Sequence, residues 1–357
     1  MRLAAIGLLI PLGLLAAPPD EGLPSIRNGG VEYVSLSEGA QRLGLKLERS
    51  VPSSAAMMKD GDRPVARFSS GSRDADIHGM RLFLGDAVIE RGSRFYMSRI
   101  DFDDRLVPRL RPDLCGPPPR VPHVVAIDAG HGGVDHGTEN HSYRSMEKTY
   151  TLDVAQRLKR LLEAAGFRVV MTREGDVTVD KERRSEIANL GGADVFISIH
   201  FNSLYPNTRT TGVETLSFPP RTQRSTDSHS PGKLNDSEQS ASPENRFDPW
   251  DAFLAGYMHR ALLAAMKTGD RGEKLEHLGV LRGLNCPGVL LESAFLSSDT
   301  EAQRLATPEF RDRIAEAMLD GIRQYDAAVR ALQPPSVTGP GPSAPTRLPP
   351  TRPSQGR

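Results

Sequence analysis

Two histidines and a glutamate are placed in this 357-residue sequence where they could act together on a metal ion. His131 lies in DAGHGG and His200 in SIHFNS, and each motif follows an apolar run typical of a buried strand. Glu147, in MEKTYTL, lies between them in the chain. Catalytic zinc sites use three nitrogen or oxygen ligands and leave a fourth position for water. This set would leave zinc with a charge of about +1, which lowers the pKa of bound water.

A second glutamate is placed for proton transfer. Glu292, in PGVLLESAFLS, directly follows three apolar residues of an expected buried strand. A buried carboxylate is costly unless it is paired, protonated or close to a metal. Glu292 is therefore the best candidate for a general base and acid. A structural ion pair with Arg282 is the alternative, and spacing alone leaves the metal site open because the sequence has no HExxH-type motif.

These candidates fall in a segment, 122–333, in which strand and helix patterns alternate. Such alternation predicts an α/β fold, with a twisted, mostly parallel or mixed sheet flanked by helices on both faces. Functional residues of such sheets lie just beyond the carboxyl ends of strands. His131, His200 and Glu292 are expected there. The expected strands are 123–128, 167–172, 194–200, 212–217 and 288–292, and the expected helices are 151–165, 181–190, 250–267 and 307–332.

A smaller segment, 29–113, precedes it and is predicted to be an α+β module with a helix over 37–43 and strands over 31–36, 64–69, 76–84 and 88–95. The runs YVSLSEGAQRLGLKLE and DIHGMRLFLGDAVIERGSRFYMSRIDF weakly resemble the small stalk domain named after copper amine oxidases. Metal binding or oxidase chemistry is not implied, because His78 stands alone there. We expect a spacer or binding role, and a Pro-rich linker over 114–121.

The chain ends and one internal stretch have unlike compositions. Residues 1–17 have the basic start, short apolar run and small final residues of a secretory signal peptide, with an uncleaved membrane anchor as the alternative. Residues 334–357 are Pro- and Arg-rich and are expected to form a disordered tail. Residues 218–249 are rich in Ser, Pro and Asn and are expected to form a flexible insert, either a lid or a solvated loop.

The whole-chain totals exclude several classes of protein. Lysine plus arginine and aspartate plus glutamate both total 45, so the formal net charge is zero. Nucleic-acid binding normally needs a basic face, and none is indicated. Two cysteines exclude a disulfide framework and a cysteine-rich zinc module. We expect Cys115 and Cys286 to be unpaired.

The motifs IDAGHGG, TREGD, ADVFISIHFNS, TTGVETL and CPGVLLESAFLS, in this order, resemble the zinc-dependent N-acetylmuramoyl-L-alanine amidases of the amidase-3 type. The resemblance covers about 122–328. By motif it implies that His131, Glu147 and His200 hold one Zn²⁺ and that Glu292 is the catalytic glutamate. It places Asn202 as a substrate-facing residue, and gives a scaffold role to Arg173, Asp176, Arg184 and Asn189. The sequence departs from the family pattern at His136, where proline is usual, and we expect a loop residue there.

The resemblance implies hydrolysis of the amide between the muramic acid lactyl group and L-alanine of peptidoglycan, in cell-wall remodelling. Peptidoglycan is then the partner, and we expect an exported monomer in the periplasm or cell envelope, anchored if the signal is uncleaved. An activator protein is left open. The alternatives are another zinc hydrolase, such as an exopeptidase, and a wall-binding protein with a degenerate site. Analysis of the products formed from muropeptides distinguishes these three possibilities.

Overall fold

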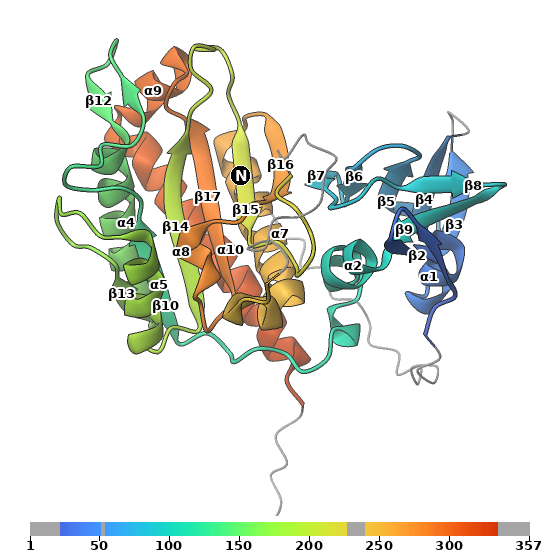
Figure 1. The fold of residues 1–357 in the computed structure, drawn as a ribbon. Helices are drawn as coiled ribbons and strands as arrows, with labels where there is room; N and C mark the ends of the chain where they lie inside the picture. The colour runs from blue at the N-terminus through green and yellow to red at the C-terminus, as the bar shows by residue number, and fades with distance from the viewer. Residues whose placement is uncertain (1–21, 51–53, 227–239, 335–357) are drawn as a thin grey trace, which may run out of the picture.

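A computed structural model describes residues 22–50, 54–226 and 240–334 (Figure 1). The predicted signal peptide and nearly all of the predicted tail lie outside these ranges. In the part of the chain that is described, no helix is both long and apolar enough to cross a membrane. Cys115 and Cys286 are both free, as predicted.

The larger segment folds around a mixed sheet that is covered by helices on both faces, which confirms the predicted α/β class. The neighbouring strands β13, β10, β14 and β17 are parallel, β15 is antiparallel to β17, and β16 is parallel to β15. The strands are β10 (Val124–Ala129), β13 (Arg168–Met171), β14 (Val195–Asn202), β15 (Val213–Ser217), β16 (Asp270–Leu275) and β17 (Gly288–Phe295).

Alternating strand residues feed two separate cores, as a sheet buried on both faces requires. Val125 and Ile127 of β10 pack with the larger helices, whereas Ala126 between them packs on the opposite face. The first face is covered by α4 (Glu147–Ala164), α7 (Asp248–Met266) and α10 (Pro308–Leu332), and the second by α5 (Lys181–Leu190) and α8 (Gly279–Arg282). The remaining elements are the short hairpin β11 (Glu139–Asn140) and β12 (Ser145–Met146), and helix α9 (Asp299–Leu305).

The smaller segment, called the N-terminal module here (22–113), has more strands than the sequence patterns predict. The expected strand 76–84 is two strands, because His78 and Gly79 both take positive φ angles, of 55° and 80°, in a tight turn. Gly92 likewise divides the expected strand 88–95. The strands are β1 (Ser25–Asn28), β2 (Val31–Ser35), β3 (Lys46–Ser50), β4 (Ala55–Asp60), β5 (Arg63–Ser69), β6 (Asp74–Ile77), β7 (Met80–Phe83), β8 (Ile89–Arg91) and β9 (Arg94–Ser98).

Helical segments between β2 and β3 and after β9 complete the module. The predicted helix is present as α1 (Leu36–Arg42). A series of helical turns that the sequence patterns did not predict follows β9. It consists of α2 (Arg99–Asp101), the π-helical turn η1 (Phe102–Leu106), α3 (Val107–Leu110) and the short turn η2 (Pro112–Leu114). In this series, η1 and α3 pack against α7 of the larger segment.

The module and the larger segment share one sheet of eleven strands (Figure 1). Strand β7 pairs with β16 in parallel, with Leu82 opposite Glu273, so the sheet runs on from β16 through β7 to β3. The Pro-rich stretch 114–121 is therefore one of several connections between the two parts.

The described parts of the expected flexible insert are packed against the protein. Phe218, Gln223 and Thr226 are buried, and the side chain of Gln223 donates a hydrogen bond to Asp101 of the module at 3.0 Å. At the other end, the helical turn η3 (Pro243–Phe247) buries Glu244 and leads directly into α7. Residues 227–239 lie outside the described residues.

Candidate metal centre

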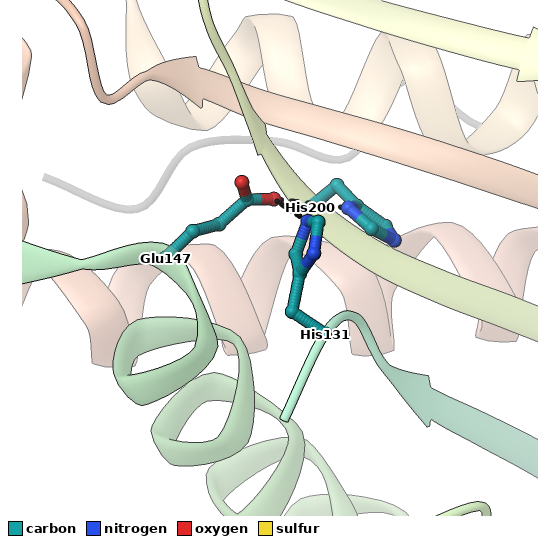
Figure 2. A group of neighbouring side chains, drawn as sticks. All are labelled: His131, Glu147 and His200. Carbon is teal, nitrogen blue, oxygen red and sulfur yellow. Dashed lines mark hydrogen bonds and ion pairs between the residues drawn. The ribbon is translucent and has the colours of Figure 1, made fainter. Parts of the chain in front are cut away.

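The two histidines and the glutamate singled out from the sequence converge at the carboxyl edge of the sheet (Figure 2). Oε1 of Glu147 lies 3.1 Å from Nε2 of His131 and 2.9 Å from Nδ1 of His200. One potential ligand atom from each residue falls within 4.8 Å of the others. Among the described residues, no other group of His, Cys, Asp and Glu side chains meets this criterion.

Each of the three side chains comes from a different element. His131 lies in the loop after β10, and its φ of 61° turns the backbone sharply there. Glu147 is the first residue of α4, which begins four residues before the predicted helix, and a carboxylate is favoured at that end by the helix dipole. His200 lies in β14, near its carboxyl end. The site therefore depends on tertiary packing of three segments.

Two glycines make room for this approach. A Cβ atom on Gly130 would fall 2.4 Å from the imidazole of His200, and one on Gly137 would fall 2.6 Å from that of His131. Both separations are far below van der Waals contact. Any larger residue at either position would displace a histidine of the group.

Buried arginines hold the loop that carries His131. Arg184 donates to the His131 carbonyl and to the Asp128 carboxylate, each at 2.8 Å. Arg173 donates to the Gly130 carbonyl at 2.9 Å. These contacts agree with the scaffold role suggested for both arginines. The Asp128 carboxylate also receives hydrogen bonds from Thr172 and Ser198, so it supports the loop through Arg184.

A carboxylate that the sequence patterns did not single out, Asp135, contacts the ring of His131. Its Oδ2 lies 2.9 Å from Nδ1 of His131. A carboxylate at this position fixes a proton on Nδ1 and leaves Nε2 free to bind a metal. An acidic residue four positions after a candidate ligand, in a glycine-rich loop, was the available signal.

The electrostatics of the group favour an ionised Glu147. Burial raises the pKa of this carboxyl, but hydrogen bonds with His131 and His200 outweigh burial and hold the pKa well below its usual range. Burial lowers the pKa of His131, and the hydrogen bond and charge of Glu147 reverse this to a net increase. The backbone amides of Thr138 and Phe201 also donate to the Glu147 carboxylate, at 2.9 and 3.0 Å. An ionised carboxylate is the form that binds metal.

Glu292 lies directly opposite His200 on the neighbouring parallel strand. Its Oε2 is buried and has no hydrogen-bond partner in the structure. Burial raises its pKa well above the usual range, Glu147, Glu214 and Glu276 add to this, and Lys274 opposes it. The predicted alternative was an ion pair with Arg282, but the Arg282 guanidinium lies over the ring of Phe218, 5.6 Å from its centre. Glu292 thus has the environment of a proton-transfer group.

A further carboxylate, Glu214, lies opposite Glu292 on its other side, on antiparallel strand β15. Lys274 donates to Glu214 Oε1 at 3.0 Å, and Asn202 donates to Oε2 at 2.7 Å. Asn202, predicted to face substrate, thus uses its amide to hold Glu214. The sequence patterns missed Glu214 and Lys274, although an acid inside the apolar run GVETL is the same signal that singled out Glu292.

His136 stays outside the group. Its Nδ1 lies 2.8 Å from Glu139 Oε1, in the loop between β10 and α4. This agrees with its interpretation as a loop residue. Its side chain is more exposed than those of the three candidate ligands, so His136 provides a natural control.

Exposed apolar side chains gather around the same edge of the sheet. Six large apolar residues are exposed in the described part of the chain, and five of them lie on the connections that follow β10, β13 and β14. Such a rim offers contact area to a large substrate. The five are Val134, Tyr143, Val177, Leu204 and Tyr205.

Fold and site together define an α/β protein with a two-histidine, one-glutamate group and a neighbouring unpartnered glutamate at the carboxyl ends of its central strands. Residues 125–324, more than half of the chain, match the amidase-3 family, described as N-acetylmuramoyl-L-alanine amidase. The chain belongs to this family. The matched residues begin at β10, so the N-terminal module precedes them.

Several curated relatives resemble the same part of the chain. An uncharacterized cell wall amidase of Bacillus anthracis is 31% identical over 209 residues, which cover 57% of this chain and 35% of the relative. A probable cell wall amidase, LytH, of Staphylococcus saprophyticus is 31% identical over 203 residues, covering 57% of this chain and 58% of the relative. The chain thus covers less than two thirds of the length of these two relatives.

A further curated relative and a solved structure match a similar share of this chain. The germination-specific N-acetylmuramoyl-L-alanine amidase of Bacillus subtilis is 27% identical over 217 residues, covering 57% of this chain and 79% of the relative. A crystal structure of an N-acetylmuramoyl-L-alanine amidase from Clostridium difficile 630 covers 58% of this chain and 97% of its own, at 29% identity and a TM-score of 0.46.

Proposed function

We propose that this protein is a zinc-dependent N-acetylmuramoyl-L-alanine amidase that cleaves the amide joining the muramic acid lactyl group to L-alanine of peptidoglycan. The observation that carries the proposal is the convergence of His131, Glu147 and His200 beside Glu292. Family membership supports the reaction class, and the site supplies the groups that this reaction needs.

The donor set fits zinc. Two imidazoles and one carboxylate are among the ligand combinations of catalytic zinc sites with an open fourth position. His131, Glu147 and His200 would hold one ion, and their ligand atoms already face one another. When bound, zinc supplies Lewis acidity, which polarises a carbonyl and makes water more acidic.

Glu292 carries the proton transfers. Its unpartnered oxygen accepts the proton of the attacking water, and a bond forms between the water oxygen and the lactyl carbonyl carbon. Glu292 then returns the proton to the L-alanine nitrogen as the C–N bond breaks. The products are a free lactyl carboxylate on the glycan and a peptide with a free L-alanine amine. Asn202 contributes by holding Glu214 beside Glu292.

The substrate class also suggests where the protein works. Peptidoglycan lies outside the cytoplasm, so we propose export by the N-terminal segment and action in the periplasm or cell envelope as a monomer. Cell-wall remodelling, including separation of daughter cells, is the corresponding process.

Product analysis on purified muropeptides tests the function. The zinc-loaded protein should release a peptide that begins with L-alanine and leave the disaccharide intact, at about one zinc per chain. Release of free amino acids from a peptide end would instead indicate an exopeptidase. Binding to cell walls without any hydrolysis would indicate a degenerate site, and either result would overturn the proposal.

A further inference from the structure

Strand β16 carries two adjacent charged residues that face opposite sides of the sheet. Successive side chains of a strand point to opposite faces. Glu273 lies opposite Thr215 in the register with β15, and Lys274 lies opposite Leu216. Thr215 contacts His259 of α7, whereas Leu216 packs in the core on the other face. The two charges of β16 therefore meet different surroundings.

On the first face, Glu273 is held by the N-terminal module. Its carboxylate forms an ion pair with Arg109 of α3, and the two side chains are only 2% and 4% exposed. Arg105 lies beside this pair, with a guanidinium that donates to Ser217 of β15 at 3.1 Å and to the Phe83 carbonyl of β7 at 3.3 Å. Removing either partner of such a buried ion pair strongly destabilises the folded protein, because the remaining charge is buried without compensation.

Strand β16 is also bound by the backbone of the module strand β7. Leu82 of β7 pairs with Glu273, and the backbone amide of Arg81 donates to the Asp270 carboxylate at 2.8 Å. Figure 1 shows the module on this side of the sheet, with β7 next to β16. The module thus contacts β16 at its first residue, Asp270, and again at Glu273.

On the opposite face, Lys274 reaches the candidate catalytic centre. Its ammonium donates to Glu214 at 3.0 Å, and Glu214 lies opposite Glu292 in the register of β15 with β17. The side chains of Lys274 and Glu214 are 13% and 10% exposed, so this contact is nearly excluded from water. The position of Lys274 thus depends on the position of β16.

We propose that the N-terminal module is a positioning part of the catalytic centre, in which Arg109 fixes β16 through Glu273 and so keeps Lys274 and Glu214 in place beside Glu292. This inference rests on the proposed amidase function. Arg109 lies before the part of the chain that matches the family, whereas Glu273, Lys274 and Glu214 lie within it. Arg109 is a positioning residue, because it acts through β16 and touches no reacting atom.

The test removes the ion pair without leaving a buried charge. The variant Arg109→Met/Glu273→Met replaces both partners with apolar residues of similar length, in the full-length zinc-loaded protein. Its matched control, Arg99→Met/Glu32→Met, removes an ion pair of 2.8 Å that lies within the module and away from β16. We expect kcat on muropeptides to fall about ten- to hundredfold in the test variant, with KM and zinc content unchanged. The variant Arg109→Lys, which retains the charge, should recover part of kcat.

Hydrogen exchange gives a second measurement that needs no substrate. In the test variant, amides of β15 and β16 should exchange faster, while those of β10 and β13 should keep the exchange rates of the parent protein. A test variant with parental kcat and parental exchange in β15 and β16 would overturn the positioning role. If the parent protein does not cleave muropeptides, the amidase proposal fails, and exchange alone decides whether the module fixes β16.

Discussion

His200 and Glu292 lie directly opposite each other on the parallel strands β14 and β17. The pairing places an imidazole of the candidate metal group next to a carboxyl group whose Oε2 has no hydrogen-bond partner. Directly paired residues of a sheet share one face. The sheet therefore brings a candidate metal ligand and a candidate proton acceptor next to each other without help from a loop.

The amide variant Glu292→Gln tests the proton acceptor. It keeps the size of the side chain but cannot accept a proton, so kcat should fall by at least about a hundredfold. Zinc content should stay at the parental value, because Glu292 is not one of the proposed ligands. The control Glu174→Gln changes an exposed acid that pairs with Lys159, and should retain activity. Near-parental turnover by Glu292→Gln would reject the assigned role.

Zinc removal tests the ligand set. Dialysis against a chelator should abolish hydrolysis, and added Zn²⁺ should restore it. His131→Ala and His200→Ala should each lose bound zinc, as measured by metal analysis, since each removes one of three ligands. His136→Ala should retain zinc, because this ring faces Glu139 in the same loop. Activity that resists the chelator would exclude a metal mechanism.

Asp135→Asn tests the contact that orients His131. The amide has the same shape but loses the negative charge next to Nδ1. Loss of such a partner typically weakens metal affinity about 10- to 100-fold. Competition with a zinc chelator measures the change. Glu139→Gln, which alters the equivalent contact of His136, is the matched control and should leave zinc affinity unchanged.

Asn202 is expected to matter through Glu214. In Asn202→Ala, one hydrogen bond to this carboxylate is lost, and we expect kcat to fall about threefold to thirtyfold with little change in KM. In Asn202→Asp, a second negative charge faces Glu214, so the fall should be larger. If instead KM rises while kcat stays constant, Asn202 contacts the substrate directly, as the family resemblance implied.

Asp248 should make stability depend on pH. Burial raises its pKa to about 8, Asp104 repels its charge, and the hydrogen bond from Asn245 and the charge of Arg105 oppose these effects. An unfolded aspartate has a pKa of about 3.9. The folded state thus binds the Asp248 proton more tightly than the unfolded state does. The free energy of unfolding that this proton contributes is fully present below about pH 4 and is lost as pH rises through about 8.

The variant Asp248→Asn has no proton to lose at this position. Between about pH 5 and pH 8.5, its Tm should therefore fall less than the Tm of the parent protein. Asp312→Asn, an exposed residue that pairs with Arg157, is the control and should follow the parent. An identical pH dependence in Asp248→Asn and the parent would show that Asp248 ionises normally in the folded protein.

The sequence alone determined the α/β class and the four residues that lie nearest the centre of the site. The class follows from apolar runs and 3.6-residue periodicity, which define strands and helices, and His131 and His200 stand out as polar residues at strand ends. Glu147 was singled out by its place between the two histidines, and the family resemblance supplied the roles of the set. Glu292 stood out because an acid is unusual inside a run such as GVLLE.

Only the tertiary structure decided which residues support that centre. Asp135 follows His131 by four residues and Glu214 stands inside an apolar run, but only the fold shows which group each contacts. Lys274 meets Glu214 across 60 residues of chain. The same applies to Arg109 and Glu273, which are separated by more than one hundred and sixty residues and meet in a buried ion pair. Strand register and domain docking set these contacts, and neither leaves a periodic signal in the sequence, because register depends on the partner strand as well as on the strand itself.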